Sequence, residues 1–210
     1  MIKSIVSEER LALCDLLESL DPYHPTLCDG WTVSHLVAHL VIRERRPIAA
    51  LGLIIPGRLV NRLAKLTSRW ASEIPFHQLI EKVRNGPPAP LRLIDGPMNL
   101  IEYFVHHEDV RRAVEGWSAR DNVIDLNNLL WERQEKMARL LTRRLNNLDL
   151  TLERPTGESI RIGSGHRPAT LIGEPGELVL YLFGRRQHSQ VRLSGDPEAV
   201  HEVQTGRLGG

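Results

Sequence analysis

The sequence predicts an α+β protein, with a helical bundle over residues 1–145 followed by a small C-terminal α+β domain over residues 146–210. Apolar residues recur at helical spacing through the first two-thirds of the chain, which is typical of amphipathic helices. From about Asn146 onward they alternate with polar residues instead, as in half-buried strands. A chain of 210 residues with 41% hydrophobic residues is long and apolar enough to bury such a core.

The bundle helices are expected from their caps and apolar stripes. Ser7 is a candidate N-cap for the first helix, and Thr32 is one for a second helix that continues to Pro47. Turn formers in residues 21–30 and the Pro-rich residues 85–90 interrupt the helical pattern. The remaining helices of this region are expected over residues 58–70, 76–84, 97–116 and 126–145.

The C-terminal domain is expected to contain four strands and one helix. The alternating segments predict strands over residues 148–152, 160–162, 169–172 and 191–193. Residues 174–183 form an apolar run that follows Gly173, and they predict the helix.

The charge distribution argues against nucleic acid and membrane surfaces as partners. The net charge is only +1 with the histidines neutral, so no overall field attracts polyanions. Arginine clusters locally, at Arg43, Arg45 and Arg46 and again at Arg111 and Arg112, and such runs are typical of solvated helix faces. We therefore expect neither nucleic-acid nor membrane binding.

A cytoplasmic location is expected from the N-terminus, the apolar runs and the cysteines. The N-terminal segment lacks the apolar core of a signal peptide, and the longest apolar run, residues 47–56, is too short to span a bilayer. The two cysteines, Cys14 and Cys28, have no metal-type spacing, and they favour a reduced compartment over a disulfide framework. Cys14 lies on the apolar face of the first helix and is expected in the core.

Two pairs of side chains suggest a divalent metal site. Glu102 and His106 are four residues apart, so they project from one face of the expected helix, and His35 and His39 share that spacing on an earlier helix. Imidazole nitrogen and carboxylate oxygen suit zinc, nickel or ferrous iron, and two facing helices can close around one ion. The alternative is that the histidines are hydrogen-bonded core residues and that Glu102 forms a weak surface pair with His106.

Two segments resemble a known family. Residues 29–40 (DGWTVSHLVAHL) resemble the helix signature of mycothiol-dependent maleylpyruvate isomerases, which belong to the wider DinB-like group of metal-binding four-helix bundles. Residues 102–109 (EYFVHHED) resemble the second signature, a Glu, a His four residues on and an Asp three further. Weaker similarity continues through residues 176–186 and 195–196. The resemblance implies a DinB-like four-helix bundle followed by a small C-terminal α/β domain.

The resemblance also implies which residues hold the metal. The family's ligands fall on His39, Glu102 and His106, and water completes the coordination sphere. Asp109 would orient His106 from behind, as metal-bound imidazoles commonly require. At the position of His35 the family more often has an acidic residue, so His35 is a partner behind the ligands, a helix-cap residue or an alternative ligand.

The resemblance implies a function as well. It suggests an isomerase or S-transferase that depends on a divalent metal, zinc above nickel or iron, and on mycothiol, the small thiol of actinobacteria, and that acts on a small electrophilic substrate. Arg185 and Arg186, near the family's arginine position, would bind a substrate carboxylate or else be surface charges. The alternatives are a metal-binding or sensor protein without catalysis, and a hydrolase that uses a metal-activated water. A homodimer through residues 47–60 is a further hypothesis.

Overall fold

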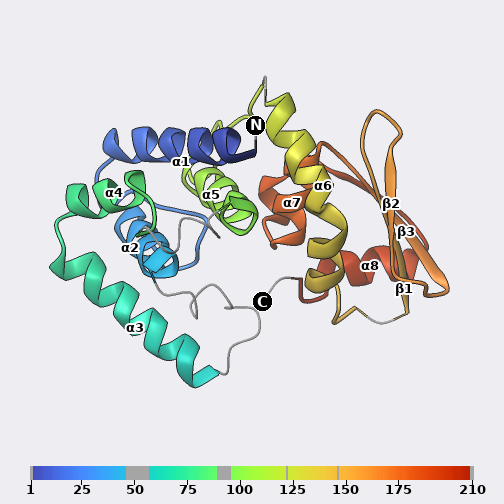
Figure 1. The fold of residues 1–210 in the computed structure, drawn as a ribbon. Helices are drawn as coiled ribbons and strands as arrows, with labels where there is room; N and C mark the ends of the chain where they lie inside the picture. Colours follow the sequence, from blue (N-terminus) through green and yellow to red (C-terminus); the bar gives the residue numbers. More distant parts are fainter. Residues whose placement is uncertain (1, 46–56, 89–95, 122, 146, 209–210) are drawn as a thin grey trace. The chain divides into compact units, whose positions relative to one another are not determined.

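The computed structural model describes residues 2–45, 57–88, 96–121, 123–145 and 147–208. The chain divides into two compact units, Met1–Ser118 and Ala119–Gly210. The described residues form eight α-helices, one short 3-10 helix and a four-stranded sheet (Figure 1). The predicted α+β class is confirmed.

The first unit consists of helices. They are α1 (Ile2–Glu18), α2 (Val33–Arg45), α3 (Gly57–Glu73), α4 (Phe76–Arg84) and α5 (Gly96–Arg111). Helix α1 packs against α4 and α5, and α2 packs against α3 and α4. The interior of this unit is built from side chains with at most 1% exposure, among them Leu13, Leu17, Leu36, Leu40, Leu79 and Leu100. Each such leucine stabilises the fold by about 1.5–3 kcal/mol relative to an exposed position, so the backbones of α2 and α5 are firmly held.

The start of α1 differs from the prediction. The helix already includes Ile2, so Ser7 lies inside it and is not an N-cap. The physical reason is that the buried face of the helix begins before Ser7. Val6 and Glu9, on either side of Ser7, are buried, while Ser7 itself is exposed. Helix α5 also ends earlier than predicted, at Arg111.

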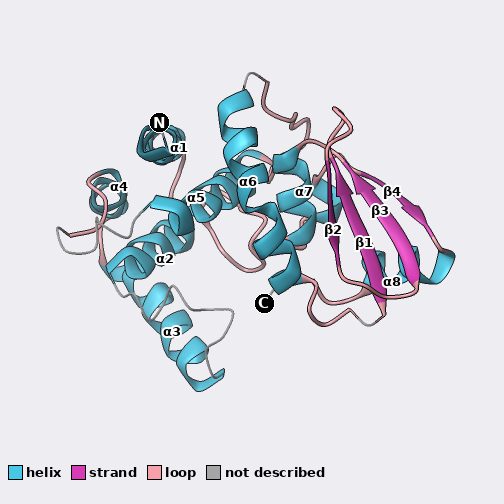
Figure 2. Cartoon of the chain, turned by 45° about the vertical axis from the view of Figure 1, so that its right-hand side comes forward, coloured by secondary structure: helices cyan, strands magenta, loops and turns pink. Residues whose placement is uncertain are grey.

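The second unit combines a mixed sheet with helices (Figure 2). Its strands lie in the order β2-β1-β3-β4, with β1 and β3 parallel and both outer pairs antiparallel. Helix α6 contacts α7 and β2, and α8 contacts β3 and β4. The elements are α6 (Ile124–Leu141), β1 (Leu148–Glu153), β2 (Ser159–Ile162), β3 (Arg167–Ile172), α7 (Pro175–Leu182), η3 (Arg186–His188), β4 (Arg192–Gly195) and α8 (Pro197–Thr205).

Helix α6 packs against elements of the second unit and belongs to it, whereas the sequence analysis assigned this helix to the bundle. The change from helical to alternating periodicity after α6 marks where the strands begin and does not mark where one unit ends. Helix α8 was not predicted, since it buries only Ala199 and Val203. A start signal was nevertheless present, because the Asp196 side chain accepts hydrogen bonds from the amides of Glu198 and Ala199.

None of the described helices combines the length and the apolar character needed to cross a bilayer. Residues 47–56, most of the stretch of residues 47–60 that the homodimer hypothesis invoked, lie outside the described residues.

The two cysteines lie in contrasting environments, which predicts a difference in reactivity. Cys14 is fully buried as expected, and burial raises the pKa of its thiol to about 12. At pH 8 only roughly one Cys14 in 10⁴ would carry the reactive thiolate, whereas Cys28 is half-buried. We expect iodoacetamide to leave Cys14 unmodified in the native protein, as located by peptide mass, and to alkylate it only after unfolding in urea. Equal alkylation of both thiols in the native protein would show that α1 is not packed as described.

Candidate metal centre

The loop before α2 is tied to α5. The amide of Leu27 donates to the carbonyl of Asp109 over 2.9 Å, and Pro25 pairs with Thr32 in an isolated β-bridge. Within the loop the amide of Trp31 donates to the carbonyl of Cys28, and Gly30 has a φ of 72°, as the third position of a type II turn requires. This turn explains the Asp-Gly step of the first signature.

His35 caps the helix that carries His39. Its Nδ1 lies 3.0 Å from Oγ1 and 3.4 Å from the amide nitrogen of Thr32, the residue just before α2. In a capping box, the side chain three residues after the N-cap accepts a hydrogen bond from the N-cap amide, and that residue is usually Glu or Gln. His35 makes this half of the capping box. The acidic residue usual in the family would fit the same role. Of the three alternatives for His35, the structure shows the helix-cap contact.

The capping contact predicts how substitutions at this position change stability. His35→Ala should lower the free energy of unfolding by about 0.5–1 kcal/mol in urea denaturation. His35→Glu should retain or exceed the parent stability, because a carboxylate accepts from the Thr32 amide and also favours a helix N-terminus. His77→Ala, at an exposed position of α4, serves as the control. Lower stability of His35→Glu than of His35→Ala would exclude the capping role.

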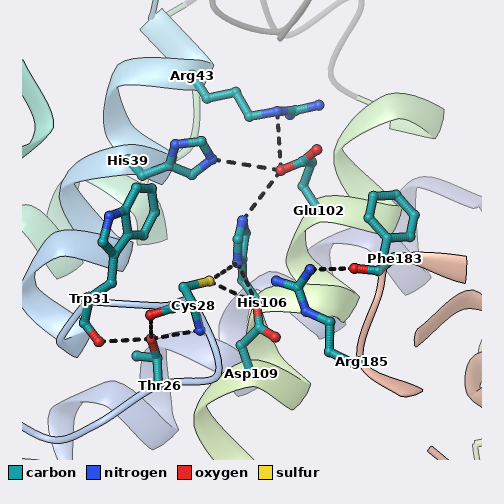
Figure 3. A network of polar contacts seen from close by, with 10 residues as sticks. All are labelled: Thr26, Cys28, Trp31, His39, Arg43, Glu102, His106, Asp109, Phe183 and Arg185. Carbon is teal, nitrogen blue, oxygen red and sulfur yellow. Dashed lines mark hydrogen bonds and ion pairs between the residues drawn. The ribbon is translucent and has the colours of Figure 1, made fainter. Parts of the chain in front are cut away.

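Helices α2 and α5 bring three donor atoms together (Figure 3). Oε2 of Glu102 lies 3.8 Å from Nε2 of His39 and 3.5 Å from Nε2 of His106. The two imidazole rings meet edge to face with their centroids 5.2 Å apart. These are the three residues that the family resemblance implied as ligands, and their donor atoms all lie within 4.8 Å of one another.

These distances fit a shared metal ion better than direct hydrogen bonds. A nitrogen-to-oxygen hydrogen bond spans roughly 2.7–3.2 Å, which is shorter than both contacts of Glu102. Two donors that each lie about 2.0–2.1 Å from a tetrahedral zinc ion are about 3.3–3.5 Å apart. The His106–Glu102 distance already has this value, and His39 would need to approach by only a few tenths of an ångström.

Asp109 fixes the orientation of the His106 ring. Its carboxylate is fully buried, and Oδ2 lies 3.0 Å from Nδ1 of His106. An ionised carboxylate can only accept, so Nδ1 carries a proton, and Nε2, which faces Glu102, is the nitrogen that a metal ion would bind. This carboxylate–histidine arrangement is the one that metal-bound imidazoles commonly use.

The electrostatics of the site favour a cation. Burial alone would raise the pKa of Glu102, but His106, His39 and Arg43 together hold it well below the ordinary value. Burial alone would lower the pKa of His106, but Asp109, Cys28 and Glu102 outweigh burial and raise it well above the ordinary value. The carboxylates of Asp109 and Glu102, which favour a proton on His106, also favour a divalent ion there, which would replace the proton on Nε2. His39 behaves differently, because burial lowers its pKa and leaves a neutral donor.

One residue beside the donors, Arg43, was not identified from the sequence. Arg43 is buried at 8% exposure, with Nε 3.4 Å from Oε2 of Glu102, and so does not belong to a solvated face as expected. The same correction applies to Arg112, which is 2% exposed and donates to Glu108. The available signal for Arg43 was its position one turn after His39 on α2.

Trp31 supports the site from the loop. Its ring centroid lies 5.2 Å from that of His39, with the planes inclined at 51°. This contact restricts rotation of the imidazole, and it gives the tryptophan of the first signature a structural role. Side-chain exposures of 30% for His39 and 25% for Glu102 leave the donor atoms within reach of solvent and small ligands.

The two arginines assigned to substrate binding lie in the second unit and contact its backbone. Arg185 donates from Nη1 to the carbonyl of Phe183 over 2.7 Å. Arg186 donates to the carbonyl of Gly206, and its guanidinium lies 5.9 Å from the ring centroid of Tyr181. Their role toward a substrate carboxylate stays a prediction.

Comparisons with known proteins bear on the family and on the fold. Residues 6–53 match the family model described as the mycothiol maleylpyruvate isomerase N-terminal domain. The predicted family resemblance is confirmed. A crystal structure of the mycothiol-dependent maleylpyruvate isomerase is similar to 91% of the chain and 90% of its own, with a TM-score of 0.62 and 18% identity. A structure of a histidine-to-alanine mutant of that isomerase gives a TM-score of 0.60 and 16% identity over the same shares.

The structural similarity extends across both units and confirms the predicted fold, a helical bundle followed by a small α/β part. At these identities it establishes the fold alone. No curated protein sequence is significantly similar to the chain.

Proposed function

We propose that the chain binds one divalent metal ion, zinc in preference to nickel or iron, through His39, Glu102 and His106. The observation that carries this proposal is the convergence of two imidazole nitrogens and one carboxylate oxygen at 3.5–3.8 Å, with Asp109 behind His106. Two histidines and one carboxylate leave a coordination position for an exchangeable ligand, as in catalytic zinc sites. Glu102 and Asp109 supply two negative charges toward a divalent ion, against the one positive charge of Arg43 beside Glu102.

We infer further that the protein is a mycothiol-dependent isomerase or S-transferase of a small electrophile. The basis is the family to which both the N-terminal match and the similar crystal structures point. A bound divalent ion would lower the pKa of a coordinated thiol, so that the thiol would be present as its thiolate at neutral pH. Addition of a thiolate to the cis double bond of an electrophilic alkene leaves a single bond and a negative charge delocalised on the neighbouring carbonyl group; after rotation about that bond, elimination expels the thiolate and leaves the trans isomer.

The residues of the chain would support this chemistry in separate ways. Asp109 holds the proton on Nδ1 of His106, so that the opposite nitrogen stays available. Arg43 and Trp31 restrain Glu102 and His39, respectively. Arg185 or Arg186 would hold a substrate carboxylate through its paired N–H groups. Dependence on a small reduced thiol agrees with the cytoplasmic location that the sequence suggests.

The test is an assay of the zinc-loaded protein with maleylpyruvate in the presence and absence of mycothiol. We expect conversion to the trans isomer only when both thiol and metal are present, and none with His106→Ala. A thioether product formed from another electrophile would identify an S-transferase. Turnover without thiol would instead indicate a hydrolase, and tight zinc binding with no turnover on any electrophile tried would indicate a binding or sensor role.

A further inference from the structure

Cys28 approaches the metal centre from the side opposite Glu102 (Figure 3). Its sulfur lies 3.1 Å from Oδ2 of Asp109 and 3.8 Å from Nδ1 of His106. His106 therefore stands between two groups of polar side chains. Its Nε2 faces Glu102 and His39, and its Nδ1 faces Asp109 and Cys28.

The distances separate a ligand group from a hydrogen-bonded group. A zinc ion shared by a thiolate and a carboxylate holds sulfur and oxygen about 3.5 Å apart, since its bonds to them are about 2.3 and 2.0 Å long. The observed 3.1 Å between Cys28 and Asp109 is shorter, as is the 3.0 Å between Asp109 and His106. Both are hydrogen-bond contacts, and the thiol is the donor toward a carboxylate that can only accept.

We propose that Cys28 is a positioning residue of the metal centre, acting through Asp109. Its thiol donates to the same oxygen that receives the Nδ1 proton of His106, and so it holds the carboxylate in the plane that orients the ring. This inference rests on the proposed metal site. It adds a residue from outside both helices, since Cys28 belongs to the loop that precedes α2.

The loop holds Asp109 at two points. The Leu27 amide binds the backbone carbonyl of Asp109, and the adjacent Cys28 thiol binds its carboxylate. The Cys28 amide in turn donates to Oγ1 of Thr26, which donates to the carbonyl of Trp31. Because the loop continues directly into α2, these contacts link the C-terminal half of α5, which carries His106, to the helix that carries His39. Cys28 thus couples the two ligand-bearing helices.

A double-mutant cycle on zinc affinity tests this role. Asp109→Ala should weaken zinc binding roughly 10- to 100-fold, and Cys28→Ala, one contact further away, roughly 3- to 10-fold. Cys28→Ser should restore most of the affinity, because its hydroxyl can donate to the same oxygen. If Cys28 acts through Asp109, the double variant should bind zinc as Asp109→Ala does, within about twofold. Cys14→Ala, a buried cysteine away from the centre, should leave the affinity unchanged.

Three outcomes would overturn the inference while leaving the metal site intact. These are parent-like affinity of Cys28→Ala, fully additive effects in the double variant, and a sulfur-to-metal charge-transfer band in the cobalt-loaded parent that Cys28→Ala abolishes. The last would make Cys28 a ligand instead of a positioning residue.

Failure of the parent to bind any metal would refute the proposed function but not this contact. In that case, proton and nitrogen NMR of the His106 ring in the metal-free protein tests whether Cys28 positions Asp109. Loss of the thiol donor leaves Asp109 a stronger acceptor, so the Nδ1 proton should move downfield in Cys28→Ala and return in Cys28→Ser. An unchanged resonance would exclude the positioning role.

Discussion

Replacing His106 with alanine is expected to abolish stoichiometric metal binding and, with it, thiol-dependent turnover. The substitution removes a donor atom itself, so its effect should exceed the roughly 10- to 100-fold loss that follows removal of a partner behind a ligand. Only Glu102 and His39 then remain as protein ligands, and two ligands are too few to hold the ion in competition with water. Zinc titration against a chromophoric chelator measures the change, with Glu102→Gln and His39→Ala expected to behave alike.

A substitution at an exposed histidine away from the centre provides the control. His77→Ala removes an imidazole from an exposed position of α4, and this variant should bind zinc as the parent does. Parent-like affinity in His106→Ala would assign the metal to other residues and remove the basis of the proposed function.

Replacing the adjacent His107 is expected to destabilise the protein without removing the metal. Nδ1 of His107 lies 2.9 Å from Oε1 of Glu9, and both side chains are at most 7% exposed. Removing one partner of a buried ion pair typically lowers the free energy of unfolding by about 3–5 kcal/mol, because the charge of the remaining partner stays buried and has lost that interaction. His107→Ala should therefore lower the urea-unfolding free energy by about this amount, while zinc stoichiometry stays at one.

A compensating substitution distinguishes this mechanism from a simple cavity. Adding Glu9→Gln to His107→Ala removes the buried charge, and part of the lost stability should return. Loss of zinc from folded His107→Ala would show that the ligand histidine is His107 and that the register of α5 differs from the one described.

The sequence was sufficient for the parts of the fold that have local signals. Thr32 marked the start of α2, and the period-two segments after Asn146 marked the strands. It was insufficient where tertiary contacts decide. Ser7 is a good capping residue, yet α1 continues past it because Val6 and Glu9 find buried neighbours. Helix α8 has two buried side chains, which is too few for a periodic pattern.

The same division applies to the candidate site. Helical spacing placed Glu102 and His106 on one face and singled out the pair His35 and His39. The family resemblance then chose His39 over His35 and added Asp109. Cys28 could not be found in this way, because a loop residue has no periodicity and its partner is 81 positions away in the sequence. Arg43 looked solvated because arginine is usually exposed, and only the approach of α5 shows that it faces Glu102.

The most direct test of the metal centre is X-ray absorption at the zinc edge of protein loaded with one equivalent of zinc. The structure predicts nitrogen and oxygen neighbours at about 2.0–2.1 Å, with imidazole scattering from two histidines and no sulfur. A sulfur neighbour at about 2.3 Å would place the ion at Cys28, and zinc that stays unbound would mean that His39, Glu102 and His106 form no metal centre.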